Sequence, residues 1–91
     1  MELAELRQEI DAIDRQIVEL VQQRMEVAAR IAACKREKGL PVLDAGRERV
    51  KLDAVAALSR EDMGGYMREL YQTLMAISRD YQNKLLEKDY E

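Results

Sequence analysis

The chain has 91 residues, of which 47% are apolar and 36% charged, and its net charge is −3. This composition fits one small folded domain, spanning residues 1–91, rather than a disordered segment. The acidic balance argues against a nucleic-acid-binding protein that depends on bulk electrostatic attraction. The sequence has no histidine, and it shows neither a ligand cluster with metal-site spacing nor a glycine-rich phosphate loop. We therefore expect no metal and no cofactor.

The amino-terminal stretch is amphipathic and charged, and no segment approaches the ~20 consecutive apolar residues of a membrane span. The single cysteine excludes an internal disulfide. We expect a cytoplasmic protein with no signal peptide and no membrane contact.

Apolar residues recur at alternating steps of three and four through the first third of the chain, as in an amphipathic helix. The series comprises Leu3, Leu6, Ile10, Ile13, Ile17 and Leu20, and after an interruption it resumes at Val27, Ile31 and Cys34. This pattern predicts a helix from about residue 3 to residue 38. Gly39 suits the left-handed position after its last turn, and Pro41 prevents the helix from continuing.

Two shorter helices are predicted to follow. Asp44 is a good N-cap for the second helix, whose inner side is formed by Leu52, Val55 and Leu58. The segment SREDMGG, residues 59–65, marks the next break, with Ser59 a candidate capping residue. A third helix then carries apolar residues at helical spacing, namely Met67, Leu70, Tyr71, Leu74, Ile77, Tyr81 and Leu85. No segment alternates with the period of two of a strand, so we expect an all-α chain of three helices.

The first predicted helix is too long for a compact single chain. At ~1.5 Å per residue it is about 54 Å long, whereas a compact domain of this size has a diameter of roughly 30 Å. Two shorter helices cannot cover it, and an uncovered apolar seam recruits partners. We therefore expect an intertwined helical-bundle homodimer in which the long helices pair.

Two cations interrupt this apolar seam. Arg24 occupies a position that should be apolar, and Lys35 lies three turns later, only ~20° around the helix. Each could lay its aliphatic stem at the edge of the core with its charged head in water. An arginine in mid-seam is costly, however, unless an anion meets it. Arg7 lies about 100° away around the helix, so it is either a solvated charge or, in an antiparallel dimer, a contribution to the other subunit's site.

The other two predicted helices also carry polar residues near their inner faces. Asp44 and Glu48 lie one turn apart with Arg47 beside them, which capping and a surface ion pair would also explain. Ser78 and Gln82 lie one turn apart next to the apolar line, where they could instead hydrogen-bond across the bundle. Together with the two cations, these residues predict a pocket for a small molecule with more than one carboxylate. A hydroxyl on that molecule could be met by Glu48.

Three segments carry a family resemblance, and they lie at residues 6–35 (LRQEIDAIDRQIVELVQQRMEVAARIAACK), 39–48 (GLPVLDAGRE) and 77–82 (ISRDYQ). They closely resemble the all-helical chorismate mutases, from about residue 3 to residue 82. The resemblance implies an intertwined dimer of three-helix chains with two active sites. It also implies conversion of chorismate to prephenate, at the branch leading to phenylalanine and tyrosine. This reaction is a rearrangement within one molecule, so it requires no proton transfer, nucleophile, metal or cofactor.

The resemblance also implies roles for the cations. Arg24 would bind a substrate carboxylate, and Arg7 would reach the site from the other subunit to help hold the dianion. Lys35 would contact both a carboxylate and the ether oxygen of the breaking bond, with Gln82 as the second donor to that oxygen. Because residue 82 is a glutamine, this donor needs no protonated carboxyl, and we expect activity to persist through neutral pH.

The remaining implied contacts concern the ring. Glu48 would accept a hydrogen bond from the ring hydroxyl, helped by the backbone at Asp44. Ser78 lies at the family's ring-carboxylate contact, and Arg47 at a supporting position next to Glu48.

Three alternatives remain open at this point. The first is an isochorismate pyruvate lyase, an enzyme that looks to have the same fold. Asp44 in the linker and Ser78 in the third helix favour the mutase over this lyase. A non-catalytic regulatory or dimerisation module, docked on another enzyme of the shikimate pathway, would be expected to lack a pocket residue, and none is missing. A plain coiled-coil adaptor does not explain why the seam is interrupted at positions that match the family. A mutase could also work in complex with another shikimate-pathway enzyme.

Overall fold

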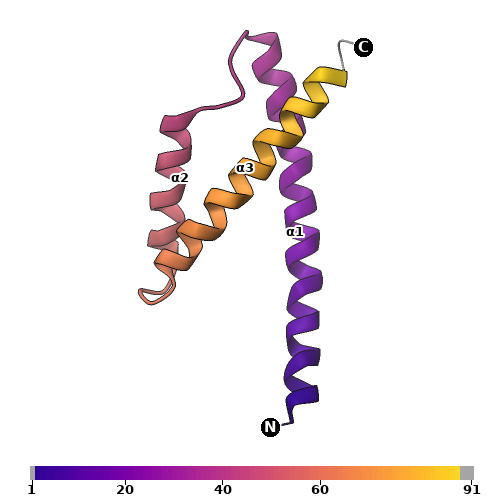
Figure 1. The fold of residues 1–91 in the computed structure, drawn as a ribbon, viewed down its shortest axis with the longest axis vertical. Coiled ribbons are helices and arrows are strands. Elements are labelled where there is room, and N and C mark those ends of the chain that lie inside the picture. Colours follow the sequence, from indigo (N-terminus) through magenta and orange to yellow (C-terminus); the bar gives the residue numbers. More distant parts are fainter. Residues whose placement is uncertain (1, 89–91) are drawn as a thin grey trace.

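The computed structural model describes residues 2–88 of the chain. These residues form three helices (Figure 1), which are α1 (Leu3–Glu37), α2 (Ala45–Leu58) and α3 (Gly64–Lys88). Residues 2–88 contain no strand, so the prediction of an all-α chain of three helices is confirmed. No helix in this part of the chain is long and apolar enough to cross a membrane.

The end of α1 follows from the residues predicted to stop it. Lys38 is the C-cap, and the backbone N–H of Leu40 donates to the carbonyl of Lys35 at 2.8 Å. Gly39 between them has a φ of 68°, in the left-handed region that glycine adopts without steric cost. The chain can therefore leave the helix sharply and enter the loop that leads to α2.

Side chains cap both ends of α2. The Asp44 carboxylate accepts from the backbone N–H of Arg47 at 2.9 Å, which confirms Asp44 as the N-cap. Ser59 caps the other end, where its hydroxyl donates to the carbonyl of Val55 at 2.6 Å. Ser59 thus terminates α2, and α3 begins five residues later at Gly64.

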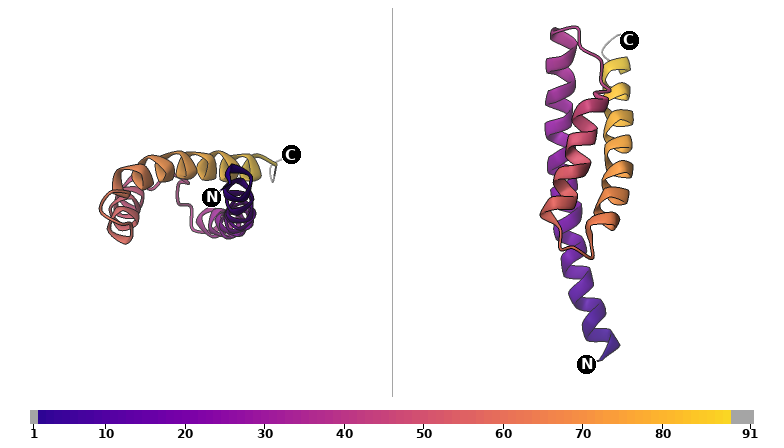
Figure 2. Two further views of the ribbon diagram at one scale, coloured as in Figure 1. Left: turned by 90° about the horizontal axis from the view of Figure 1, so that it is seen from below. Right: turned by 90° about the vertical axis from the view of Figure 1, so that its left-hand side faces the viewer.

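Helix α3 holds the three helices together. It packs against both α1 and α2, whereas no close backbone contact joins α1 to α2 within the described residues. In Figure 1, α3 runs obliquely from the foot of α2 to the carboxyl-terminal end of α1. The end-on view in Figure 2 shows α3 bridging the space between the other two helices. Helix α3 is therefore the element whose packing positions α1 and α2 relative to each other.

The core of the single chain is small and consists of Ala28, Ala32, Val55 and Met75. Ser78 and Gln82 are buried beside it. Leu58 was expected on the inner side of α2, but it is 87% exposed because it is the last residue of the helix, at its open end. On α3, Leu70 and Ile77 are about half exposed, since the apolar surface of this helix is wider than the two neighbouring helices of one chain cover.

The amino-terminal half of α1 projects beyond the other helices (Figure 2). Its apolar series is 41–61% exposed, and comprises Leu3, Leu6, Ile10, Ile13, Ile17 and Leu20. The radius of gyration is 16.4 Å, compared with about 12 Å for a compact chain of this length. The predicted length of the first helix is therefore confirmed, and one chain alone leaves its apolar face uncovered.

Candidate active site

A cavity of about 380 Å³ lies between α1 and α2, and residues of α3 also line it. This volume is within the range of small-molecule sites, roughly 300–1,000 Å³. Its lining comes from all three helices and from the loop before α2. Seven of the eight predicted site residues line it, namely Arg24, Lys35, Asp44, Arg47, Glu48, Ser78 and Gln82.

Arg7 is the predicted site residue that lies elsewhere. It is exposed on the projecting half of α1 and does not line the cavity of its own chain. Helical geometry accounts for this position, because Arg7 lies about 100° from Arg24 around α1. A contribution of Arg7 to the site of a second chain stays a prediction.

The cavity is cationic although the chain as a whole is acidic. Five of its lining residues are positively charged and two are negatively charged, which leaves an excess of three positive charges. The cations are Arg24, Lys35, Arg47, Lys51 and Arg79, and the acids are Asp44 and Glu48. A cleft lined mainly by one sign of charge concentrates ligands of the opposite sign. The cavity therefore suits a small anion with more than one negative charge.

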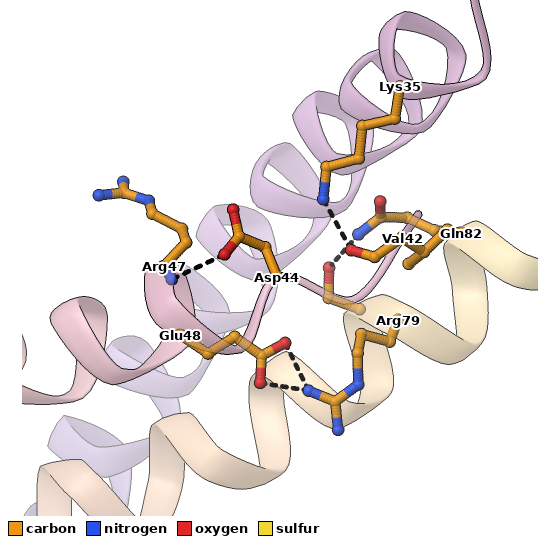
Figure 3. A network of polar contacts seen from close by, with 8 residues as sticks. Lys35, Val42, Asp44, Arg47, Glu48, Arg79 and Gln82 are labelled. Atoms are coloured by element: carbon orange, nitrogen blue, oxygen red, sulfur yellow. Dashed lines mark hydrogen bonds and ion pairs between the residues drawn. The ribbon is translucent and has the colours of Figure 1, made fainter. Parts of the chain in front are cut away.

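Lys35 is held in place by the loop between α1 and α2 (Figure 3). Its Nζ donates to the carbonyl of Val42 at 2.7 Å, in a partly buried position. An ammonium group has three donor hydrogens, so two of them remain for a ligand. The charge of Lys35 is thus positioned before any ligand arrives.

Gln82 and Ser78 form a buried polar pair on α3. The Gln82 Nε2 donates to the Ser78 hydroxyl at 3.1 Å, and the two residues are only 7% and 6% exposed. The amide nitrogen keeps a second hydrogen, and the carbonyl oxygen Oε1 is buried with no hydrogen-bond partner among residues 2–88. A buried polar atom left unpaired is costly, so this pair is better suited to contacting a polar ligand than to filling the core.

Glu48 is paired with a residue that the sequence analysis did not single out. The Nη1 of Arg79 donates to both carboxylate oxygens of Glu48 (Figure 3). The two residues are 31 positions apart in the chain, so no local pattern indicates the pair. The one available signal was that Arg79 directly follows Ser78.

Arg24 packs against an aromatic ring of α3. Its guanidinium carbon lies 5.8 Å from the centre of the Tyr71 ring, within the range of a cation–π interaction. Arg24 is half-buried and lines the cavity, so this contact positions its charge without removing it fully from solvent.

The chemistry on offer is therefore electrostatic. Cations and neutral hydrogen-bond donors converge on the cavity together with one paired acid. No group of three or more histidine, cysteine or acidic side chains among residues 2–88 is placed to hold a metal ion. Such a site can bind, orient and stabilise negative charge on a ligand.

Comparison with known proteins bears directly on this site. The family model described as chorismate mutase type II matches residues 6–83. The chain belongs to the chorismate mutase type II family. Among the chorismate mutases, the protein of that name from Methanocaldococcus jannaschii is 37% identical over 59 residues, which are 65% of this chain and 60% of that protein.

Two further relatives carry additional or different activities in their names. A bifunctional chorismate mutase/prephenate dehydratase from Aquifex aeolicus is 41% identical over 64 residues, 70% of this chain and 18% of the relative. A 4-amino-4-deoxychorismate mutase from Streptomyces venezuelae is 36% identical over 55 residues, 60% of this chain and 53% of the relative. The chain therefore spans less than two thirds of the length of these three curated relatives. No solved structure matches the chain significantly.

Proposed function

We propose that the chain catalyses the rearrangement of chorismate to prephenate. In this reaction the ether C–O bond of the side chain breaks and a new C–C bond forms to the ring, within one molecule and without proton transfer. The observation that carries the proposal is the convergence of Arg24, Lys35 and Gln82 with one paired acid in a cationic cavity. Chorismate is a dianion, which an excess of positive charge favours.

Lys35 and Gln82 act where charge develops. Negative charge grows on the ether oxygen as the C–O bond breaks, and the proposal assigns the Lys35 ammonium and the Gln82 amide as its two donors. Lys35 is already fixed by the Val42 carbonyl, so little reorganisation is needed when the transition state forms. Holding the side chain over the ring in a compact geometry supplies a further share of the rate enhancement.

The other residues bind and orient the substrate in this proposal. Arg24 meets a carboxylate, and Ser78 meets the ring carboxylate. Glu48 accepts from the ring hydroxyl, helped by the backbone at Asp44, and Arg47 supports Glu48 from the next position on α2. Neither the family nor the relatives named above favours a pyruvate lyase or a non-catalytic module.

The proposed active unit is an intertwined homodimer with two sites. Its support is the uncovered apolar series of α1 and the position of Arg7 outside its own cavity. In an antiparallel pairing of the long helices, Arg7 of each subunit would approach the cavity of the other. The location of the protein in the cytoplasm stays a prediction, and so does its association with another shikimate-pathway enzyme.

The test is the loss of chorismate absorbance with purified protein, with prephenate confirmed as the product. We expect saturable turnover, and a fall in kcat of about 10²-fold or more in Lys35→Ala, because removing one donor to a developing oxyanion typically has this effect. Lys38→Ala is the matched control, since Lys38 is an exposed lysine at the end of the same helix and does not line the cavity. A folded wild-type dimer without turnover would refute the proposal.

A further inference from the structure

One acid of the cavity is already neutralised by the protein itself. Arg79 donates to both carboxylate oxygens of Glu48, and the pair links α2 to α3 (Figure 3). Both side chains line the cavity, and they are only 32% and 25% exposed. The roles assigned above leave Arg79 without a function of its own.

Two further cations of α2 line the cavity that contains Glu48. Arg47 precedes it on α2, Lys51 follows one turn later, and both line the cavity. A ligand atom that reaches Glu48 therefore meets a carboxylate that already contacts one cation, in a cavity lined by further cations. Such a carboxylate still accepts a hydrogen bond from a neutral hydroxyl. It offers little net attraction to a second cation, which would also be repelled by Arg79.

We infer that Arg79 is a specificity-determining positioning residue, which makes the site select a neutral hydroxyl over an ammonium at the ligand position that Glu48 contacts. The inference rests on the proposed function, in which that position carries the ring hydroxyl. The relative from Streptomyces venezuelae is named for a compound that differs at this point. In 4-amino-4-deoxychorismate an amine replaces the hydroxyl, and an alkyl amine is protonated at neutral pH.

The test compares kcat/KM for chorismate with kcat/KM for 4-amino-4-deoxychorismate in matched variants. Arg79→Gln keeps a donor for Glu48 and removes the charge, whereas Arg79→Lys retains the charge. Arg68→Gln is the control, because Arg68 also pairs across α2 and α3, with Asp53 at 2.8 Å, and lies outside the cavity.

A charge within about 4–6 Å of an ionised group typically shifts its equilibrium by one to three pKa units, so we expect Arg79→Gln to move the selectivity ratio roughly tenfold or more toward the amine. Arg79→Lys and Arg68→Gln should keep the wild-type ratio. Distortion of the site would lower both kcat/KM values together and leave the ratio in place.

An unchanged ratio in a folded, neutral variant would overturn the inference and leave the mutase assignment intact. If circular dichroism shows that Arg79→Gln is unfolded, Arg79→Met provides the second neutral variant. Unfolding of both would identify Arg79 as a structural residue and would equally overturn the inference. A wild-type protein without chorismate turnover would instead refute the proposed function, and the inference with it.

Discussion

Replacement of Ile13 by alanine should weaken the proposed dimer substantially. Ile13 lies in the middle of the uncovered apolar series of α1 and is 52% exposed in the single chain. The substitution removes three carbon atoms, each contributing ~0.8 kcal/mol when fully buried, so about half of that total, ~1.2 kcal/mol, is gained on pairing. A two-fold dimer contains the change twice. We therefore expect a loss of about 2.4 kcal/mol, or roughly a 50-fold rise in the dissociation constant.

The assay is sedimentation equilibrium of fluorescently labelled protein over a wide range of concentrations, with chorismate turnover measured at the same dilutions. Gln22→Ala is the matched control, because Gln22 is an exposed side chain of similar size that lies about 180° from Ile13 around the same helix. It should leave the dissociation constant unchanged. A wild-type protein that sediments as a monomer throughout, or an Ile13→Ala dimer as tight as the wild type, would refute the argument.

Three further outcomes are expected. In Gln82→Glu, activity should fall as the pH rises through the pKa of the new carboxyl, because only the protonated form can donate to the ether oxygen, whereas a steep loss of wild-type kcat/KM between about pH 5 and 7 would contradict the assigned donor. Asp44→Ala should reduce the free energy of unfolding by about 0.5–2 kcal/mol in urea titrations, because the N-cap bond to Arg47 is lost; an unchanged midpoint would show that the cap is dispensable. Arg7→Ala and Lys35→Ala, each nearly inactive alone, should regain about a quarter of wild-type activity when mixed and allowed to exchange, since each mixed dimer holds one intact site. Recovery would be absent if Arg7 served its own chain.

Features that depend on neighbours in the chain could be predicted from the sequence. The stop at Gly39 and Pro41 and the cap at Asp44 are determined by backbone geometry and by one side chain each. Arg24 and Lys35 lie on one rigid helix, so their common direction follows from helical periodicity alone. The cavity lies where the residues predicted from these local patterns face Ser78 and Gln82 of α3.

Features that depend on the packing of separate helices could not be predicted in this way. Arg79 finds Glu48 only because α3 crosses next to α2, 31 residues away in the chain. Met75 is buried, whereas Ile77 on the same helix is not, because the direction of the crossing decides which part of a broad apolar surface is covered. The family resemblance indicated the polar contacts of the ligand, but it did not indicate how the acid among them is paired.

The packing of α3 also allows apolar side chains of the core to affect the distance between the cavity walls. Because no close backbone contact joins α1 to α2 among the described residues, the separation of the two cavity walls depends largely on how closely α3 approaches each of them. That approach depends on small side chains such as Ala28 and Ala32, since the distance between packed helices follows the size of the residues at their contact. One added methyl group in the core can therefore change the distance between Lys35 and Gln82 without altering any polar group. In this architecture, the size of the core side chains and the spacing of the polar groups that line the cavity are linked.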